Sequence, residues 1–269
     1  KREREREGME EVWLQTVQAF GSEEKAFVFG TFLVHELVFI IGNVWLAILY
    51  HFQWPFFEQF RIQKGKFPPK SLIWTCLRLA LVNHLLYIPA MLLSYQTFKK
   101  AGMTSEAPLP SWMEVGRHVF VNMIIEDFGF YWMHRFLHWR VIYKHIHKMH
   151  HQFNYSIGIA SEYAHPVEFL LSNTIPFTLG SMLQGSHMMT FWIWTALRVA
   201  ETIDGHSGYQ FPWSPFAWFP FTGGPEKHDY HHSNNIGNFG SFFNFWDWVC
   251  GTNLAYKKHL HHKNEKING

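Results

Sequence analysis

Three long apolar segments dominate the hydrophobic pattern of this chain of 269 residues. Residues 26–52 form an almost unbroken apolar run, long enough to cross roughly 30 Å of hydrocarbon as a helix. A linker rich in lysine and proline follows, and residues 71–95 form the second run. The third, residues 167–200, is interrupted by Pro176, Gly180 and the stretch QGSH, which favours a short helical hairpin over one span. The pattern therefore predicts about four passes or half-passes of a membrane.

The remaining half of the chain is more polar and carries most of the histidines. Helical spacing, with little alternation typical of strands, predicts helices in residues 127–168 and 204–263. The aromatic and proline-rich stretch 209–221 cannot be a regular helix; it suits a membrane–water boundary, or an aromatic core loop. We expect an all-α protein in which a histidine-rich helical cap rests on a membrane anchor. We expect a single domain over residues 26–256, followed by a polar tail over 257–269.

Residues 1–25 form a charged leader. Its first eight residues alternate basic and acidic side chains before Met9, so they fit a truncated leader, a vector-derived remnant or a solvated charged helix. No cleavable signal peptide is predicted. Mean hydropathy is −0.12, so a large part of the chain is expected to meet water. A net charge of +2, mixed in sign along the chain, gives no reason to expect a nucleic-acid partner.

Eight histidines fall into three short sets with helical spacing. HRFLH places two of them four residues apart, and both HKMHH and HDYHH place histidines at i, i+3 and i+4, so each set is expected to point its rings one way. Imidazoles crowded together without a partner would be desolvated or would repel one another when charged, and a metal relieves both costs. The eight candidate ligands are His134, His138, His147, His150, His151, His228, His231 and His232.

Eight ligands exceed the three or four that one zinc ion takes, so two ions are predicted. Imidazole suits iron, copper, nickel and zinc alike, so the metal stays open on these grounds. Isolated histidines such as His35, His51, His118 and His187 are expected to be satisfied core residues instead.

Acidic residues in or beside apolar sequence are candidate functional groups, although ion pairs with Arg135, Arg140 or Arg198 would explain them equally. Asp127 lies two helical turns before His134, and we expect it to accept an N–H from a ligand imidazole. The other members of this group are Glu126, Glu162, Glu168, Glu201 and Asp204.

The three sets, in this order, resemble the fatty acid hydroxylase superfamily of membrane di-iron enzymes. Further stretches over about residues 27–256 resemble its C4-methylsterol oxidase branch: NHLLYIPAML, IEDFGFYWMHRFLH, IYKHIHKMHH, SEYAHPVE, ETIDGHSGY and FWDWVCGT. The resemblance implies that the eight histidines bind two iron ions. It also suggests His206 in DGHSG and His165 in AHPVE as further ligands or their close partners.

The resemblance implies a non-haem monooxygenase that uses O2 to oxidise a C–H group of a membrane lipid, with a sterol C4 methyl group as the expected substrate. A fatty-acyl or sphingoid hydroxylase and a sterol desaturase remain alternatives, as does a zinc-binding membrane protein without redox activity. The chain has no dinucleotide-binding glycine fingerprint, so electrons from NAD(P)H must arrive through an external donor. The resemblance implies cytochrome b5 and its reductase, and residence in the endoplasmic reticulum membrane.

The charges along the chain give only part of its orientation in the membrane. Basic residues flank the first apolar run on both sides, so the positive-inside rule does not orient a single span there. A re-entrant first segment, bent near Gly42 and Asn43, would resolve this. Four basic residues accompany the histidines and favour a cytosolic cap: Arg135, Arg140, Lys144 and Lys148.

Overall fold

The computed structural model describes residues 2–268 and is helical throughout, with 71% of residues in helices and only two isolated β-bridges among the described residues. The longer helices are α1 (Arg2–Ala19), α3 (Thr31–Phe52), α5 (Lys70–Lys100), α6 (Trp112–Leu137), α9 (Ile175–Leu183), α10 (Met188–Gly205), α11 (Gly224–Asn234) and α13 (Leu254–Asn268). Shorter turns of helix join them: α2 (Glu23–Lys25), η1 (Ala26–Gly30), α4 (Pro55–Glu58), α7 (Arg140–Tyr143), η2 (His150–Gln152), η3 (Gly158–Glu162), α8 (Pro166–Glu168), η4 (Phe169–Thr174), η5 (Pro215–Trp218) and α12 (Phe245–Val249).

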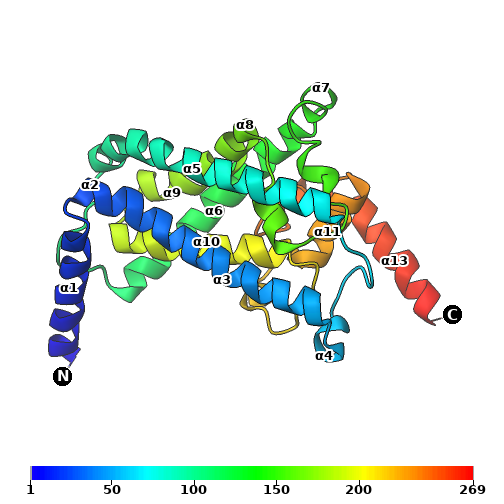
Figure 1. Ribbon diagram of the computed structural model, residues 1–269, viewed down its shortest axis with the longest axis horizontal. Coiled ribbons are helices and arrows are strands. Elements are labelled where there is room, and N and C mark those ends of the chain that lie inside the picture. Colours follow the sequence, from blue (N-terminus) through cyan, green and yellow to red (C-terminus); the bar gives the residue numbers. More distant parts are fainter. Residues whose placement is uncertain (1, 269) are drawn as a thin grey trace.

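Two helices are long and apolar enough to cross a membrane, Glu23–Phe52 and Lys70–Lys100. They run side by side along the body of the molecule, with α1 and α13 projecting from its opposite ends (Figure 1). Only 17% and 33% of their most apolar windows are buried in the protein. Such exposed apolar surface is what lipid covers, and it agrees with the first two runs predicted from the sequence.

The third apolar segment is a broken helical unit, as its prolines and glycines predict. Helices α9 and α10 are separated by a turn in which Gly185 has φ +56°. Helix α9 packs closely on α6, and a side chain at Gly180 would bring its Cβ within 2.6 Å of Asn122 Oδ1. Helix α10 packs on α3 and also contacts α6 and α11.

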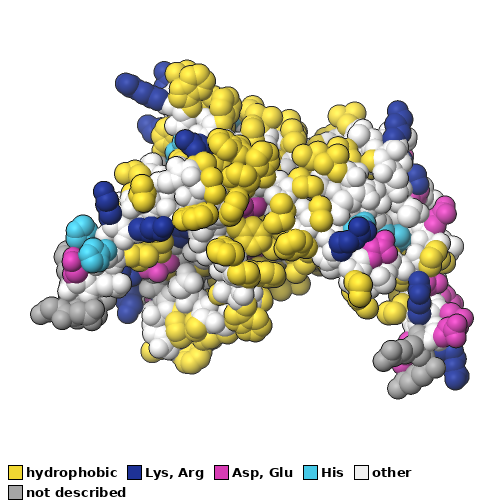
Figure 2. Space-filling model, turned by 180° about the vertical axis from the view of Figure 1, so that it is seen from behind, with side chains coloured by type: hydrophobic (Ala, Val, Ile, Leu, Met, Phe, Trp, Pro, Cys, Tyr) yellow, Lys and Arg dark blue, Asp and Glu magenta, His cyan; other side chains and the backbone are white. Residues whose placement is uncertain are grey.

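The main core lies between these helices near the start of α3. Aromatic rings from three segments meet there, with Phe27, Phe98 and Phe191 in mutual contact at ring-centroid distances of 5.0–5.8 Å. The other face of the molecule carries hydrophobic side chains across its middle and charged ones mainly toward the two ends (Figure 2). The segments that carry the histidines lie at the end of the body where α7 and α11 are found (Figure 1).

Candidate metal centre

Helix α6 delivers the first pair of histidines at its C-terminal end. His134 lies in the last turn and His138 is the C-cap residue, so both rings leave the helix on one side, as their spacing predicts. Tyr131, one turn earlier, is fully buried on the same side.

The second set, HKMHH, is not the α-helical turn that its spacing predicts. Residues 144–149 form turns, and only His150 to Gln152 complete a short 3₁₀ segment. His147 and His151 point toward the α6 pair, whereas His150 points to a different group of histidines.

The third set, HDYHH, is helical but also divides its rings. It lies in α11, where His228 and His232 are one turn apart and their Nε2 atoms are 3.1 Å from each other. His231 instead faces the α6 pair. The expectation that three rings of one turn point the same way is therefore wrong for both His-x-x-His-His sets, because the i+3 and i+4 positions serve two separate clusters.

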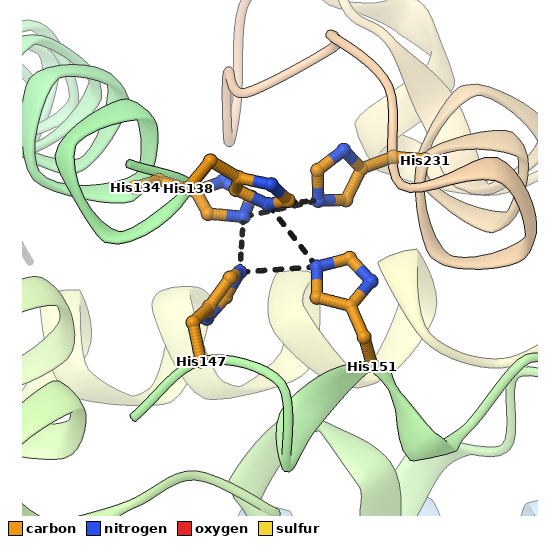
Figure 3. A group of neighbouring side chains, drawn as sticks. All are labelled: His134, His138, His147, His151 and His231. Atoms are coloured by element: carbon orange, nitrogen blue, oxygen red, sulfur yellow. Dashed lines mark hydrogen bonds between the residues drawn. The ribbon is translucent and has the colours of Figure 1, made fainter. Parts of the chain in front are cut away.

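The first of these, the five-histidine cluster, is a closed ring of nitrogen atoms (Figure 3). Neighbouring Nε2 atoms around the ring lie 3.0–3.3 Å apart. Ligands on one metal ion at about 2.0–2.1 Å lie roughly 2.9–3.4 Å apart for bond angles between 90° and tetrahedral. The spacing therefore suits one ion. The members are His134, His138, His147, His151 and His231.

The second, the four-histidine cluster, contains His150, His206, His228 and His232, with one ligand nitrogen from each within 4.8 Å of the others. His206 Nε2 is 2.9 Å from His228 Nε2. His206 directly follows the last residue of α10. This position brings it next to histidines of the three sets, although it stands alone in the sequence. The ring centroids of His151 and His232, one from each cluster, are 4.9 Å apart, so the clusters are neighbours.

Hydrogen bonds at the far side of the rings fix which nitrogen carries the proton in the five-histidine cluster. Nδ1 of His134, His147 and His231 donates to Phe239 O at 3.0 Å, Glu168 Oε1 at 2.7 Å and Gly237 O at 2.5 Å, respectively. These oxygens accept, so each Nδ1 carries the hydrogen of its neutral ring and each Nε2 presents a lone pair. Yet His134 Nε2 lies 3.0 Å from His147 Nε2 and 3.1 Å from His231 Nε2.

The four-histidine cluster is arranged in the same way. Nδ1 of His150 donates to Tyr163 O at 3.1 Å, and Nδ1 of His206 donates to Thr202 O at 2.8 Å. Lone pairs facing one another at hydrogen-bond distance leave no proton to share, whereas a cation between them satisfies all of them. Both clusters thus fit a bound metal ion.

Burial keeps these rings neutral. Burial is the largest cause, and for His134 and His206 neighbouring imidazoles add to it; the pKa falls to about 4 for His134 and His150 and to about 3 for His206. For His231 and His232 the same two causes lower the pKa well below the ordinary value. Neutral imidazole is the form that binds a metal, so the rings are ready to act as ligands at neutral pH.

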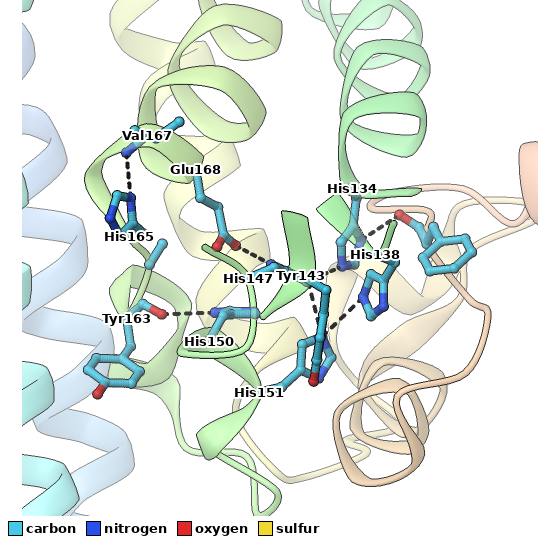
Figure 4. Close-up of polar contacts among 12 residues, drawn as sticks. His134, His138, Tyr143, His147, His150, His151, Tyr163, His165, Val167 and Glu168 are labelled. Carbon is cyan, nitrogen blue, oxygen red and sulfur yellow. Dashed lines mark hydrogen bonds and ion pairs between the residues drawn. The ribbon is translucent and has the colours of Figure 1, made fainter. Parts of the chain in front are cut away.

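Glu168 is the carboxylate in direct contact with a clustered ring (Figure 4). It is 4% exposed and follows Pro166 in the one-turn helix α8. From the sequence, Glu168 was predicted only as one of several acidic residues in or beside apolar sequence that are candidate functional groups. The signal for its role was the resemblance stretch SEYAHPVE, which ends at this residue.

Two other predicted residues lie elsewhere. Asp127 is buried, but its Oδ1 accepts from the backbone N–H of Phe243 at 2.9 Å rather than from a ring. His165 stands apart from both clusters and accepts from Val167 N at 3.2 Å, capping α8 (Figure 4). Glu126 and Glu201 both pair with Arg198, at 2.9 and 2.7 Å.

The loop between α11 and α12 supports the five-histidine cluster, and Asp247 of α12 holds this loop in place. Its carboxylate accepts from the N–H groups of Phe239 and Gly240 and pairs with Lys227 at 2.5 Å. Phe239 O is the acceptor for His134 Nδ1. The buried ion pair therefore fixes the backbone that orients a ligand ring.

Small cavities lie beside the clusters. One of about 30 Å³ is lined by His147, His150 and His206, large enough for one or two molecules the size of water or O2. A second, of about 60 Å³, is lined by Phe169, Phe177 and Val199 among others and shares Asn173 and Thr202 with the first. The two cavities therefore adjoin each other, one beside the apolar helices and the other beside the histidines.

Comparison with known proteins agrees with this arrangement. Residues 119–252, which include every clustered histidine, match the family described as Fatty acid hydroxylase. The chain is 40% identical over 254 residues to a protein named very-long-chain aldehyde decarbonylase GL1-8 from Oryza sativa subsp. indica, covering 93% of each chain. The chain belongs to the fatty acid hydroxylase family. No solved structure matches it.

Other members of this fatty acid hydroxylase family are named for sterol oxidation. Methylsterol monooxygenase 2-2 from Arabidopsis thaliana is 39% identical over 253 residues, covering 93% of this chain and 94% of the relative. Methylsterol monooxygenase 1-3 from the same plant is 40% identical over 240 residues, covering 87% and 81%. The oxidoreductase character, the membrane-type helices and the histidine clusters thus fit one family.

Proposed function

We propose that this protein is an O2-dependent di-iron oxygenase that oxidises a C–H group of a membrane lipid, with a sterol C4 methyl group as its substrate. The observation that carries the proposal is the pair of neighbouring clusters whose Nε2 lone pairs face one another at 2.9–3.3 Å. Nine nitrogen ligands in two groups exceed what a single ion takes. A purely structural zinc protein would not need two adjacent, all-imidazole sites.

When bound, a pair of iron ions supplies the redox chemistry that couples O2 to oxidation of an unactivated C–H bond. The protein holds the ligands, excludes water and positions the substrate. Glu168 and the carbonyls of Phe239 and Gly237 keep the rings in one tautomer. Hydroxylation of one C–H bond by O2 takes up two electrons and two protons and releases water, so an electron donor is required.

We propose cytochrome b5 and its reductase as that donor, drawing on NAD(P)H. The exposed basic residues Arg140 and Lys144 lie between the first two histidine sets, and the exposed Lys148 lies within the second. They support an active site on the cytosolic side of the endoplasmic reticulum membrane. In this arrangement α3 and α5 cross the bilayer and the α9–α10 hairpin enters it, giving about four passes or half-passes.

The sterol substrate is supported by the relatives named methylsterol monooxygenase, which align over most of the chain. A relative named for aldehyde decarbonylation aligns equally well, so a long-chain aldehyde is a second candidate substrate. The products distinguish these two substrates. The sterol would give a sterol alcohol or acid, and the aldehyde would give a hydrocarbon shortened by one carbon.

A substrate panel tests the proposal. Iron-loaded protein in lipid vesicles, supplied with cytochrome b5, its reductase and NADPH, is incubated separately with a 4,4-dimethylsterol, a fatty acid, a sphingoid base and a long-chain aldehyde. We expect oxygenated product from the sterol and none with His231→Ala. Product from an acyl or aldehyde substrate alone would reassign the substrate. Tightly bound zinc with no turnover on any of them would favour the non-redox alternative.

A further inference from the structure

A third group of ligand atoms lies outside both clusters, between the two membrane-type helices. His35 of α3, His84 of α5 and Glu162 of η3 each offer one atom within 4.8 Å of the others. His84 belongs to the stretch NHLLYIPAML, for which the histidine clusters provide no role, and Glu162 belongs to SEYAHPVE, whose Glu168 contacts the five-histidine cluster. Buried ionisable groups within apolar helices are costly and are kept for a function.

Both rings have their proton positions fixed by one carboxylate. Glu36 Oε1 lies 3.1 Å from His35 Nδ1 and 2.8 Å from His84 Nδ1, so each Nδ1 donates to it and each Nε2 presents a lone pair. A carboxylate behind two imidazoles is the usual arrangement behind metal-bound histidines.

The free sides of the rings face a second carboxylate across a gap. Glu162 Oε1 is 3.9 Å from His35 Nε2, and Glu162 Oε2 is 3.8 Å from His84 Nε2. These distances are too long for hydrogen bonds, and both His84 Nε2 and Glu162 Oε2 are buried without a hydrogen-bond partner. The side chains of these two residues are 6% and 7% exposed.

The negative charges of Glu36 and Glu162 also favour a bound cation. No lysine or arginine forms an ion pair with Glu36 or Glu162 within residues 2–268. Arg198, which lines the adjoining cavity with His35 and Glu162, already pairs with Glu126 and Glu201. The Glu162 side chain is 7% exposed and that of Glu36 is 20% exposed, and a divalent ion beside Glu162 would balance the charge of both carboxylates.

We propose that His35, His84 and Glu162 bind a divalent transition-metal ion such as Zn²⁺, separate from the ions of the histidine clusters. Two imidazoles and one carboxylate are a common zinc ligand set, and ligand pairs on such an ion lie about 3.3–3.5 Å apart, slightly less than the gap here. His35 and Glu162 also line the 60 Å³ cavity. The ion ties α3 and α5 to the segment whose Tyr163 carbonyl orients His150.

Metal counting tests the site. The full chain and its variants are purified from zinc-supplemented cells, desalted, and assayed for zinc and iron per chain by mass spectrometry. We expect Glu162→Gln and His84→Ala each to hold one metal equivalent less than the unaltered protein. His51→Ala, which removes an exposed histidine from α3 outside the group, should hold the full number. Equal metal content in Glu162→Gln and the unaltered protein would overturn the proposal.

Two further measurements cover other outcomes. If Glu162→Gln and His84→Ala fail to fold, the unaltered protein decides: three ions per chain support the site and two overturn it. His231→Ala separates this proposal from the di-iron proposal, because failure of the clusters to bind metal would leave its count unchanged while Glu162→Gln still lost one equivalent.

Discussion

Nδ1 of His147 lies 2.7 Å from Oε1 of Glu168, and this buried contact fixes the tautomer of a ring at the centre of the five-histidine cluster. Removing the charge while keeping the shape tests its importance. We expect Glu168→Gln to fold and to lose about 10- to 100-fold in metal affinity or turnover, the range typical of such partners. The measurement is metal content against competing chelator, together with product formation.

Asp127→Asn is the matched comparison for Glu168→Gln. The sequence predicted that Asp127 accepts an N–H from a ligand imidazole, but its carboxylate accepts from the N–H of Phe243, and an asparagine oxygen can still accept that hydrogen bond. We therefore expect Asp127→Asn to retain more metal than Glu168→Gln. A larger metal loss in Asp127→Asn would show that the ring contact of Glu168 is not the important one.

The two clusters should be separable by single substitutions. His231→Ala removes a ligand of the five-histidine cluster, and His228→Ala removes one of the four-histidine cluster. We expect each to lower metal content and both to abolish oxidation. His145→Ala, at an exposed position between the first two sets, should leave both unchanged. Full activity in His231→Ala would contradict the two-cluster account.

Acid should destabilise the metal-stripped protein. In the unfolded chain these histidines take up protons near pH 6.5, whereas in the folded protein the pKa of His134 and His150 is about 4. The free energy of unfolding is therefore highest above pH 6.5 and falls as the pH is lowered toward 4. Urea unfolding between pH 7.5 and 5 measures this, and a flat profile would contradict the buried, neutral state of the rings.

The buried pair Lys227–Asp247 should matter far more than an exposed one. Lys227 is 4% and Asp247 0% exposed, so Asp247→Asn leaves an unpaired buried charge and frees the loop behind His134. We expect a loss of about 3–5 kcal/mol in stability. Lys263→Ala, which breaks the exposed pair with Glu226, should cost about 1 kcal/mol or less. Thermal unfolding of both variants provides the comparison, and equal effects would contradict it.

The sequence predicted the helical class, the two membrane-type helices and the broken third segment, because apolar length and proline or glycine breaks act locally. It also identified the eight histidines of the three sets, which the structure brings together in the two clusters. It could not divide them between two clusters, since the partners of His150 and His231 come from distant segments of the chain. Periodicity alone could not reveal Glu168 or the His35 group, whose partners come from distant segments.

Oxygen labelling tests the central claim most directly. Iron-loaded protein in vesicles, with cytochrome b5, its reductase and NADPH, is given a 4,4-dimethylsterol under ¹⁸O2, and the product is analysed by mass spectrometry. The account predicts one ¹⁸O atom in a C4 hydroxymethyl product, and no labelled product with His231→Ala. Unlabelled product, or no sterol oxidation by protein that holds two iron ions, would contradict it.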